Sequence, residues 1–375
     1  MADEVIAFMH SCDELYGNAS SMHTLGRQAA AGIEWARSEI AKLLSSDADD
    51  VYFTSGASES NNMVLNIFRD RADAGDSRNR IIISTVEHPA TIETAKYFVS
   101  KGYHVDQCPV DSIGRLRLDV LESMMGDDVA LVSVMTGNNE SGTIQPVKEA
   151  ARIAHEHGAY FHTDATQAIG KIPVSVEDIG ADYLSLSGHK FYGPKGVGVL
   201  YAKHGVPLYP FVHGGHQEKG MRAGTYNNQA IYDIGKAAEL ARKNLEEEHR
   251  MLWQMREALR RGIEARIPDV VVNGSNDESL CLPGTLNMSF PSAEGESILL
   301  YLDLEGIEVS TGSACATGSL EPSYVLLAAG LDVELAHGSI RFSFGRYNTM
   351  DDVDYVLEKL PPIIEKVRSM STRKV

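Results

Sequence analysis

Short apolar runs alternate with helix-like stretches through the first two thirds of the chain. The runs with the pattern of buried strands are residues 51–54, 81–84, 130–135, 160–163 and 183–187. Helical patterns lie between several of them, at residues 59–68, 90–99 and 147–157. Strands that alternate with helices in this way predict an α/β fold built around a mostly parallel sheet.

The last third of the chain has a different pattern. A long charged helical region covers about residues 231–267, and a mixed α+β segment follows Pro268. We therefore expect a large domain over residues 1–250 and a smaller α+β domain over residues 251–375. The opening residues 1–9 form a helical pattern that we assign to the smaller domain. The run Glu246-Glu247-Glu248 is interpreted as a solvated helix face.

Composition and charge narrow the function. With 375 residues, of which 43% are hydrophobic, the chain can bury a large core and is not of the disordered class. The net charge of −18 repels phosphates, so we expect no nucleic-acid partner. The opening lacks the pattern of a signal peptide, and no apolar run is long enough to span a membrane. We expect a cytoplasmic protein that does not bind membranes.

Candidate chemistry follows the predicted strands, where open α/β sheets bind their ligands. Lys190 lies at the end of a strand, within the glycine-rich run SGHKFYGPKGVG. An enclosed lysine can form a Schiff base with an aldehyde cofactor. Taken alone, the run would be interpreted as an ordinary glycine-rich turn with surface lysines.

Three further strand ends carry matching groups. Asp164 could pair with a protonated pyridine nitrogen, while Gln167 donates to a ring oxygen. The turn at residues 55–62 could form a phosphate cup at a helix start. His88 could stack on a cofactor ring and exchange protons. Each could instead be a helix cap or a structural hydrogen bonder. Together with Lys190, they make pyridoxal 5′-phosphate (PLP) the favoured cofactor.

One cysteine differs from the other three. Cys315 lies among small residues at 310–319, whereas a structural cysteine is expected among large apolar neighbours. We interpret Cys315 as a reactive thiol that needs an activating neighbour to become a thiolate. The remaining cysteines, which we expect to be inert packing residues, are Cys12, Cys108 and Cys281. No C-x-x-C pair or metal-finger spacing occurs, so no metal site is assigned.

Two arginines follow near the end of the chain. Arg341 has the planar guanidinium that suits bidentate binding of a substrate α-carboxylate. For Arg346 we favour a surface ion pair instead.

These motifs resemble those of one family, the cysteine desulfurases of the NifS/IscS type within the class V aminotransferase group. The matching runs, in the family's order, are SGASESNN, VEHPAT, GNNESGTIQP, HTDATQAIGK, SLSGHKFYGPKGVG, HGGHQEKGMRAGT, STGSACATGSLEPSYVL and GSIRFSFGRYNT. They extend from Phe53 to Thr349, so the resemblance covers nearly the whole chain.

The resemblance implies a fold-type-I PLP enzyme, with a seven-stranded large domain, a smaller domain and a homodimer. Lys190 would be the Schiff-base lysine, Asp164 the pyridinium partner, and His88 the stacking and acid–base residue. Gln167 would bond the ring hydroxyl. The residues that would surround the phosphate are Ala57, Ser58, Ser187 and His189. Thr225 would reach the phosphate bound by the partner subunit. Asn139 and Arg341 would hold the substrate carboxylate.

The implied reaction converts L-cysteine to L-alanine and leaves the sulfur as a persulfide on Cys315. The run Leu320-Glu321-Pro322-Ser323 is similar to the corresponding run in one branch of this family. Members of that branch pass sulfur to a scaffold protein for iron–sulfur cluster assembly. In a complex with that partner, Cys315 could also ligate a cluster. Two alternatives stay open: a class V aminotransferase or selenocysteine lyase-like enzyme, and a PLP-holding platform with weak activity.

Family members carry a strand with an Asn-Asn-Ala-Thr-Thr-Pro-like run ahead of the helix at residues 1–9. We expect that segment to complete the active-site wall, and desulfurase activity to be lower without it.

Overall fold

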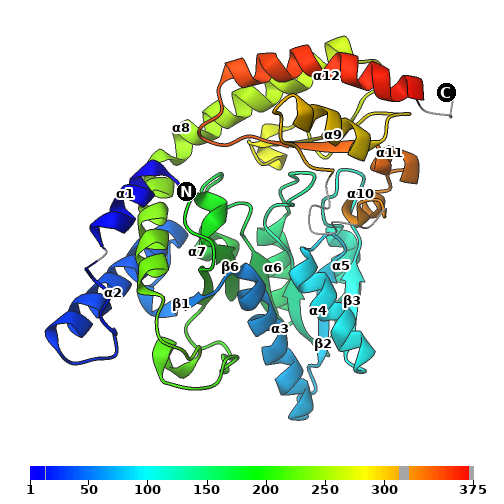
Figure 1. Ribbon diagram of the computed structural model, residues 1–375. Coiled ribbons are helices and arrows are strands. Elements are labelled where there is room, and N and C mark those ends of the chain that lie inside the picture. Colours follow the sequence, from blue (N-terminus) through cyan, green and yellow to red (C-terminus); the bar gives the residue numbers. More distant parts are fainter. Residues whose placement is uncertain (13, 312–320, 371–375) are drawn as a thin grey trace. The chain divides into compact units, whose positions relative to one another are not determined.

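The computed structural model describes residues 1–12, 14–311 and 321–370 (Figure 1). They form two compact units, each built from several segments of the chain. Unit 1 contains Met1–Cys108, Leu118–Thr136 and Pro146–Leu245. Unit 2 contains Pro109–Arg117, Gly137–Gln145 and Glu246–Val375. This division differs from the expected one, because two short insertions of the first half belong to unit 2.

A seven-stranded sheet forms the centre of unit 1 and confirms the α/β prediction. Its strands are β1 (Val51–Thr54), β2 (Arg80–Ser84), β3 (His104–Cys108), β4 (Val129–Ser133), β5 (Tyr160–Asp164), β6 (Tyr183–Ser187) and β7 (Gly198–Ala202). They lie in the order β1-β7-β6-β5-β4-β2-β3, and only β7 runs against the others. Strands β4, β6 and β7 are buried along their whole length, as expected for a sheet that is covered on both faces.

Unit 1 also contains helices, some of them packed directly against this sheet (Figure 1). They are α1 (Asp3–Ser11), α2 (Thr24–Leu44), α3 (Ala57–Asp73), α4 (Pro89–Ser100), α5 (Leu118–Met124), α6 (Val147–Glu156) and α7 (Val176–Ile179). Short 3-10 turns are η1 (Ala48–Asp50), η2 (Gly188–Phe191) and η3 (Gln217–Gly220). Helix α3 contacts β1, β5, β6 and β7, so its first turn is fixed against the middle of the sheet.

Unit 2 is an α+β structure around a three-stranded antiparallel sheet in the order β10-β9-β8. Its elements are β8 (Val271–Asn273), η4 (Glu278–Leu280), β9 (Thr285–Ser289), α9 (Gly295–Leu304), α10 (Tyr324–Ala328), α11 (Val333–His337), β10 (Ser339–Ser343) and α12 (Met350–Met370). The long helix α8 (Asn228–Arg266) begins in unit 1 and ends in unit 2. The core of unit 2 is formed by apolar residues of α8, α9, α12 and the three-stranded sheet, such as Leu259, Leu302, Leu360, Leu286 and Ile340.

Three local expectations need correction. The opening helix belongs to unit 1 rather than to the smaller unit, and Ala2 N donates to Tyr192 O at 3.0 Å. Arg346 forms an ion pair, but with Glu248 at 2.5 Å, and the two side chains are only 11% and 10% exposed. The acidic run of α8 is therefore not wholly solvated, because its last carboxylate is buried by pairing with a distant arginine.

Two buried titratable groups connect neighbouring strands of the sheet. His162 on β5 bonds Ser133 Oγ of β4 through Nδ1 at 2.8 Å and Ser185 Oγ of β6 through Nε2 at 3.0 Å. Glu87 Oε1 accepts from Ser84 Oγ at 2.5 Å and from Met135 N at 2.8 Å, which joins the ends of β2 and β4. Burial lowers the pKa of His162 to about 4 and raises the pKa of Glu87 to about 8. Both groups are therefore neutral at pH 7.

Acid should destabilise the protein through His162. Its pKa is lower in the folded protein than the ordinary 6.5, so the unfolded chain binds an extra proton as the pH falls. Between pH 6.5 and 4, this linkage should remove roughly 2–3 kcal/mol of unfolding free energy. Urea unfolding of the wild type and His162→Gln across that range measures the difference in slope. Parallel pH profiles for the two proteins would contradict the assignment.

Glu87 should make the stability depend on pH in the opposite direction. Its folded pKa lies above the ordinary 4.5, so unfolding releases a proton as the pH rises and stability is lost toward pH 8. Glu87→Gln keeps an acceptor for Ser84 and Met135 but cannot ionise. From pH 5 to pH 8, the variant should gain about 3 kcal/mol relative to the wild type. A constant difference between the two proteins over this range would show that Glu87 does not titrate in this way.

Candidate active site

The predicted chemical residues of unit 1 follow strands that end at one edge of the sheet. Strands β1, β2, β5 and β6 are mutually parallel, so their carboxyl ends lie together. At or within four residues of these ends lie the turn at Ser55, the residue His88, the carboxylate Asp164 and the residue Lys190. The expected convergence of the motifs at strand ends is therefore what the topology produces.

Lys190 lies on η2, one residue beyond His189, and both side chains are exposed in the single chain. Ser187 at the end of β6 is buried, and its Oγ lies 3.1 Å from His189 Nδ1. Burial lowers the pKa of His189, and the charges of Lys190 and Lys195 add to this effect. His189 is therefore a neutral ring whose Nδ1 contacts a hydroxyl beside the lysine.

The first turn of α3 has the form of an anion cup. Its N-cap is Gly56, which has no side chain to cap the first N–H groups, and Ala57 and Ser58 follow. A Cβ on Gly198 would lie 2.5 Å from Gly56 Cα and 2.6 Å from Leu186 O, so only glycine allows this turn to approach β7 and β6. The N–H groups of a helix start, with an exposed Ser58 hydroxyl, suit a phosphate.

His88 is held in one tautomer by the helix that it begins. Its Nδ1 accepts from Ala90 N at 3.1 Å, which caps α4 and assigns the proton of the neutral ring to Nε2. Burial lowers the pKa of His88; the Asp164 charge opposes this effect and the Lys190 charge reinforces it. The three side chains therefore lie within one electrostatic neighbourhood.

Asp164 ends β5 as a buried carboxylate, only 4% exposed. Its Oδ2 accepts from Asn61 Nδ2 of α3 at 2.7 Å, and its Oδ1 accepts from Thr166 N at 2.9 Å. Gln167 follows in the same turn and is half-buried. Its Oε1 accepts from Lys171 Nζ at 3.0 Å, which orients the amide so that the NH₂ group can donate elsewhere.

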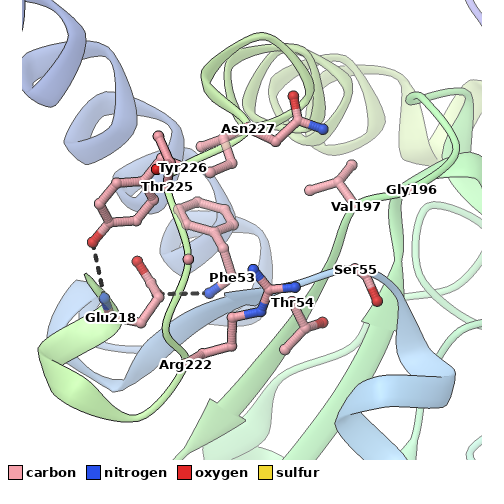
Figure 2. Close-up of a pocket in the computed structure, with 12 residues that line it drawn as sticks. Phe53, Thr54, Ser55, Gly196, Val197, Glu218, Arg222, Thr225, Tyr226 and Asn227 are labelled. Carbon is pink, nitrogen blue, oxygen red and sulfur yellow. Dashed lines mark hydrogen bonds between the residues drawn. The ribbon is translucent and has the colours of Figure 1, made fainter. Parts of the chain in front are cut away.

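Thr225 lines a pocket of about 160 Å³ in unit 1, together with Ser55, Val197 and Arg222 (Figure 2). Arg222 Nε pairs with Glu59 Oε1 of α3 at 2.9 Å. The loop before Thr225 is anchored by Glu218, whose side chain is buried and accepts from Phe53 N at 2.7 Å. Thr225 itself is exposed.

Glu218 is the centre of a buried network that the sequence did not indicate. Its carboxylate receives two bonds from Arg37, at 2.9 and 2.7 Å, and its N–H donates to Tyr226 Oη at 2.9 Å. Glu218 and Lys219 both have left-handed backbone angles, with φ of 47° and 57°. Such angles are costly for residues other than glycine, and the fully paired carboxylate holds the turn in place.

The two residues expected to bind a substrate carboxylate lie in unit 2. Arg341 on β10 donates from Nη1 to Asn139 O at 2.6 Å, so the sequence-predicted pair is in contact. Arg341 also bridges Ser310 through its backbone, with N–O distances of 2.6 and 3.2 Å. Next to Asn139, Glu140 Oε2 accepts from Ser323 Oγ at 2.5 Å. Residues on both sides of 312–320 are thus held near this pair.

Cys315 lies outside the described residues. The other three cysteines are all buried, as expected for packing residues. Burial raises the pKa of the Cys281 thiol, which keeps it protonated and unreactive. Among the described residues, no cluster of histidine, cysteine or acidic side chains is arranged to hold a metal ion.

Several residues of the site were not identified from the sequence pattern. Asn61 and Glu87 both belong to motifs that were recognised, SGASESNN and VEHPAT, but neither was given a role. A polar residue on the apolar face of a helix is the signal that could have identified Asn61. Arg37 and Glu218 had no such signal, because they are 181 residues apart in the chain.

No helix within the described residues combines the length and apolar character that crossing a membrane requires.

Comparison with known proteins identifies the family. Residues 2–356 match the family Aminotransferase class-V. The chain is 48% identical to "Cysteine desulfurase IscS" of Dictyoglomus turgidum over 362 residues, which cover 96% of this chain and 91% of the relative. It is 43% identical to "Cysteine desulfurase NifS" of Azotobacter vinelandii over 371 residues, 98% of this chain and 91% of the relative.

Solved structures agree with these relatives. A NifS-like protein superposes with a TM-score of 0.90 at 39% identity, covering 98% of this chain and 96% of the other. A structure of SspA in complex with cysteine superposes with a TM-score of 0.81 at 30% identity, covering 93% and 97% of the two chains. The chain therefore belongs to the class-V aminotransferase family and, within it, to the cysteine desulfurases of the IscS/NifS type.

Proposed function

We propose that this desulfurase binds PLP through Lys190, takes sulfur from L-cysteine, and holds that sulfur as a persulfide on Cys315. The observation that carries the proposal is the shared neighbourhood of Lys190, His88 and Asp164 at the carboxyl edge of the sheet. An amine, an imidazole and a buried carboxylate are the groups that a pyridine aldehyde cofactor requires.

The residues present fit PLP. The uncapped start of α3 can receive its phosphate, together with Ser58, Ser187 and His189. Asp164 is a buried carboxylate with defined orientation, as a partner for a protonated ring nitrogen requires. The NH₂ group of Gln167 can donate to the ring oxygen, since its carbonyl is taken by Lys171. When bound, PLP would supply a conjugated ring that stores the electrons left after Cα of the substrate loses its proton.

Different residues of the chain would then bind the substrate, accept its proton and donate a proton. Arg341 and Asn139 would bind the substrate carboxylate, since a guanidinium held against a backbone carbonyl keeps further N–H groups for an anion. Lys190 would accept the Cα proton. His88 would donate from Nε2, because its Nδ1 is committed to Ala90.

Sulfur transfer would take place at Cys315. Its thiolate attacks the substrate sulfur, the S–S bond forms, and the Cβ–S bond of the substrate breaks. The proton released by the thiol completes the methyl group of alanine, so L-cysteine and one thiol give L-alanine and one persulfide. Cys315 is supported as the acceptor by the burial of the other three cysteines and by the anchoring of Ser310 and Ser323 beside Arg341 and Glu140.

We further propose a homodimer in which Thr225 reaches the phosphate bound by the second subunit. A pocket beside the start of α3, lined by the exposed Thr225, supports this assignment. The persulfide would pass to a scaffold protein for iron–sulfur cluster assembly, as the motif after Cys315 suggests.

Lys190 can be tested by colour. The purified protein should be yellow from covalently bound PLP, and Lys190→Ala should abolish that absorption band because no amine then captures the aldehyde. Lys195→Ala, which changes a lysine of the same glycine-rich run, is the matched control and should keep the band. An unchanged visible spectrum in Lys190→Ala would refute the assignment.

Cys315 can be tested by product and by mass. Cys315→Ser should bind PLP and L-cysteine but should release alanine at about one hundredth of the wild-type rate or less, because no thiolate is present to take the sulfur. Cys281→Ser is the control and should retain turnover. Mass spectrometry of the wild type after reaction with cysteine should find the added sulfur on Cys315 alone. Near-wild-type alanine release by Cys315→Ser would favour a lyase that needs no acceptor thiol.

A further inference from the structure

Asn61 is a fully buried polar side chain that the proposed mechanism has not used. It lies on α3, one turn after the proposed phosphate cup, and its side chain is 0% exposed. Its Nδ2 donates to Asp164 Oδ2 at 2.7 Å. The same helix therefore contributes its N-terminus to one end of the cofactor site and an amide to the carboxylate at the other end.

The other atom of this amide is left without compensation. Among the contacts of the described residues, Asn61 Oδ1 is buried and has no hydrogen-bond partner. A buried, unbonded carbonyl costs stability, and a leucine, which has a similarly branched side chain, would occupy the site without that cost. Turning the amide around would place Oδ1 against a carboxylate oxygen, so the observed orientation is the favourable one. What the amide contributes is therefore its N–H group.

That N–H group completes the fixation of Asp164. Thr166 N donates to Oδ1, so each carboxylate oxygen receives one bond from a rigid donor at the end of β5 or on α3. Each oxygen keeps lone-pair capacity for a further donor. With the Thr166 bond alone, the carboxylate could rotate about its Cβ–Cγ bond; the second bond, from a different element, removes this freedom.

The neighbouring asparagine fixes α3 on another side. Asn62 Oδ1 accepts from Thr94 Oγ1 of α4 at 2.9 Å, and its Nδ2 donates to Ala90 O at 3.4 Å. Ala90 is the residue whose N–H is capped by His88. Two consecutive residues of α3 thus connect it to β5 and to α4. These bonds fix the position of the helix, and therefore the position from which Asn61 donates to Asp164.

We propose that Asn61 is a positioning residue that directs the Asp164 carboxylate toward the ring nitrogen of the bound cofactor. This inference rests on the proposed function, because it takes Asp164 as the partner of that nitrogen. A misdirected carboxylate would hold the ring proton less firmly, and the absorption of the lysine-bound cofactor would respond to pH differently. The effect would be on the cofactor's electronic state and affinity, beyond any loss of fold stability.

The test compares Asn61→Leu with Asn66→Leu. Asn66 is a nearly buried asparagine of the same helix, and its Nδ2 bonds only the helix backbone, at Asn62 O, 2.8 Å away. The readouts are the PLP dissociation constant, the pH midpoint of the visible band, and the urea midpoint of the cofactor-free protein. Asn61→Leu should weaken PLP binding by about tenfold, as loss of one charge-assisted bond predicts. It should also move the pH midpoint of the visible band by roughly half a unit. Asp164→Asn should move this midpoint in the same direction and by more.

The outcomes separate the inference from the function on which it rests. Asn66→Leu should leave both cofactor readouts unchanged, whatever it does to the urea midpoint. If Asp164→Asn changes both readouts while Asn61→Leu matches Asn66→Leu, Asn61 has no positioning role and the proposed function stands. If Asp164→Asn changes neither readout, the cofactor assignment itself fails.

A further variant covers the case in which Asn61→Leu does not fold. Asn61→Ser keeps a hydroxyl donor on a shorter side chain that no longer reaches Asp164 at 2.7 Å. It should show the same direction of change in PLP affinity and in the pH midpoint. Wild-type values of both in Asn61→Ser would overturn the proposal.

Discussion

The burial of one negative charge, on Asp164, constrains the rest of the candidate site. A carboxylate taken out of water needs donors that are already in place, and here they come from α3 and from the turn after β5. The two titratable groups that span the neighbouring strands are kept neutral at pH 7, with Glu87 protonated and His162 unprotonated. Burial is the main cause of both states; the Asp164 charge reinforces the protonation of Glu87 and opposes the neutral state of His162 and of His88.

Much of the fold could be predicted because it rests on local pattern. Strands β1, β2 and β4 are nearly continuous apolar runs, which is what a sheet covered on both faces requires, while β5 and β6 combine apolar residues with small or buried polar ones. Strand β3 was missed because it is a partly exposed edge strand with His104, Asp106 and Gln107 in its sequence. Strand β7 was missed because it follows a glycine-rich turn and runs against its neighbours, so the βα alternation did not mark it.

The candidate site was predictable to the extent that its residues follow strand ends. Lys190, Asp164 and His88 were proposed in this way, and the resemblance to a family added Asn139 and Arg341, which the structure brings into contact. The supporting residues were not found, because their partners are distant in sequence. Asn61 and Asp164 are 103 residues apart, and nothing in the local pattern of either indicates the other. The same reason hid the pairing that buries Glu248 against Arg346.

The hydrogen bond that His88 Nδ1 accepts from Ala90 N couples the capping of α4 to the protonation of the ring. The lone pair on Nδ1 that receives Ala90 N–H is the same lone pair that a second ring proton would occupy. An imidazolium at this position carries hydrogen on both nitrogens and cannot accept from Ala90 N, so protonation of His88 and this side-chain cap of α4 exclude one another. Protonation of the ring therefore costs α4 one capping hydrogen bond, while the bonds from Thr91 N and Ile92 N to His88 O still hold the turn, and the stability of this cap becomes part of the basicity of His88.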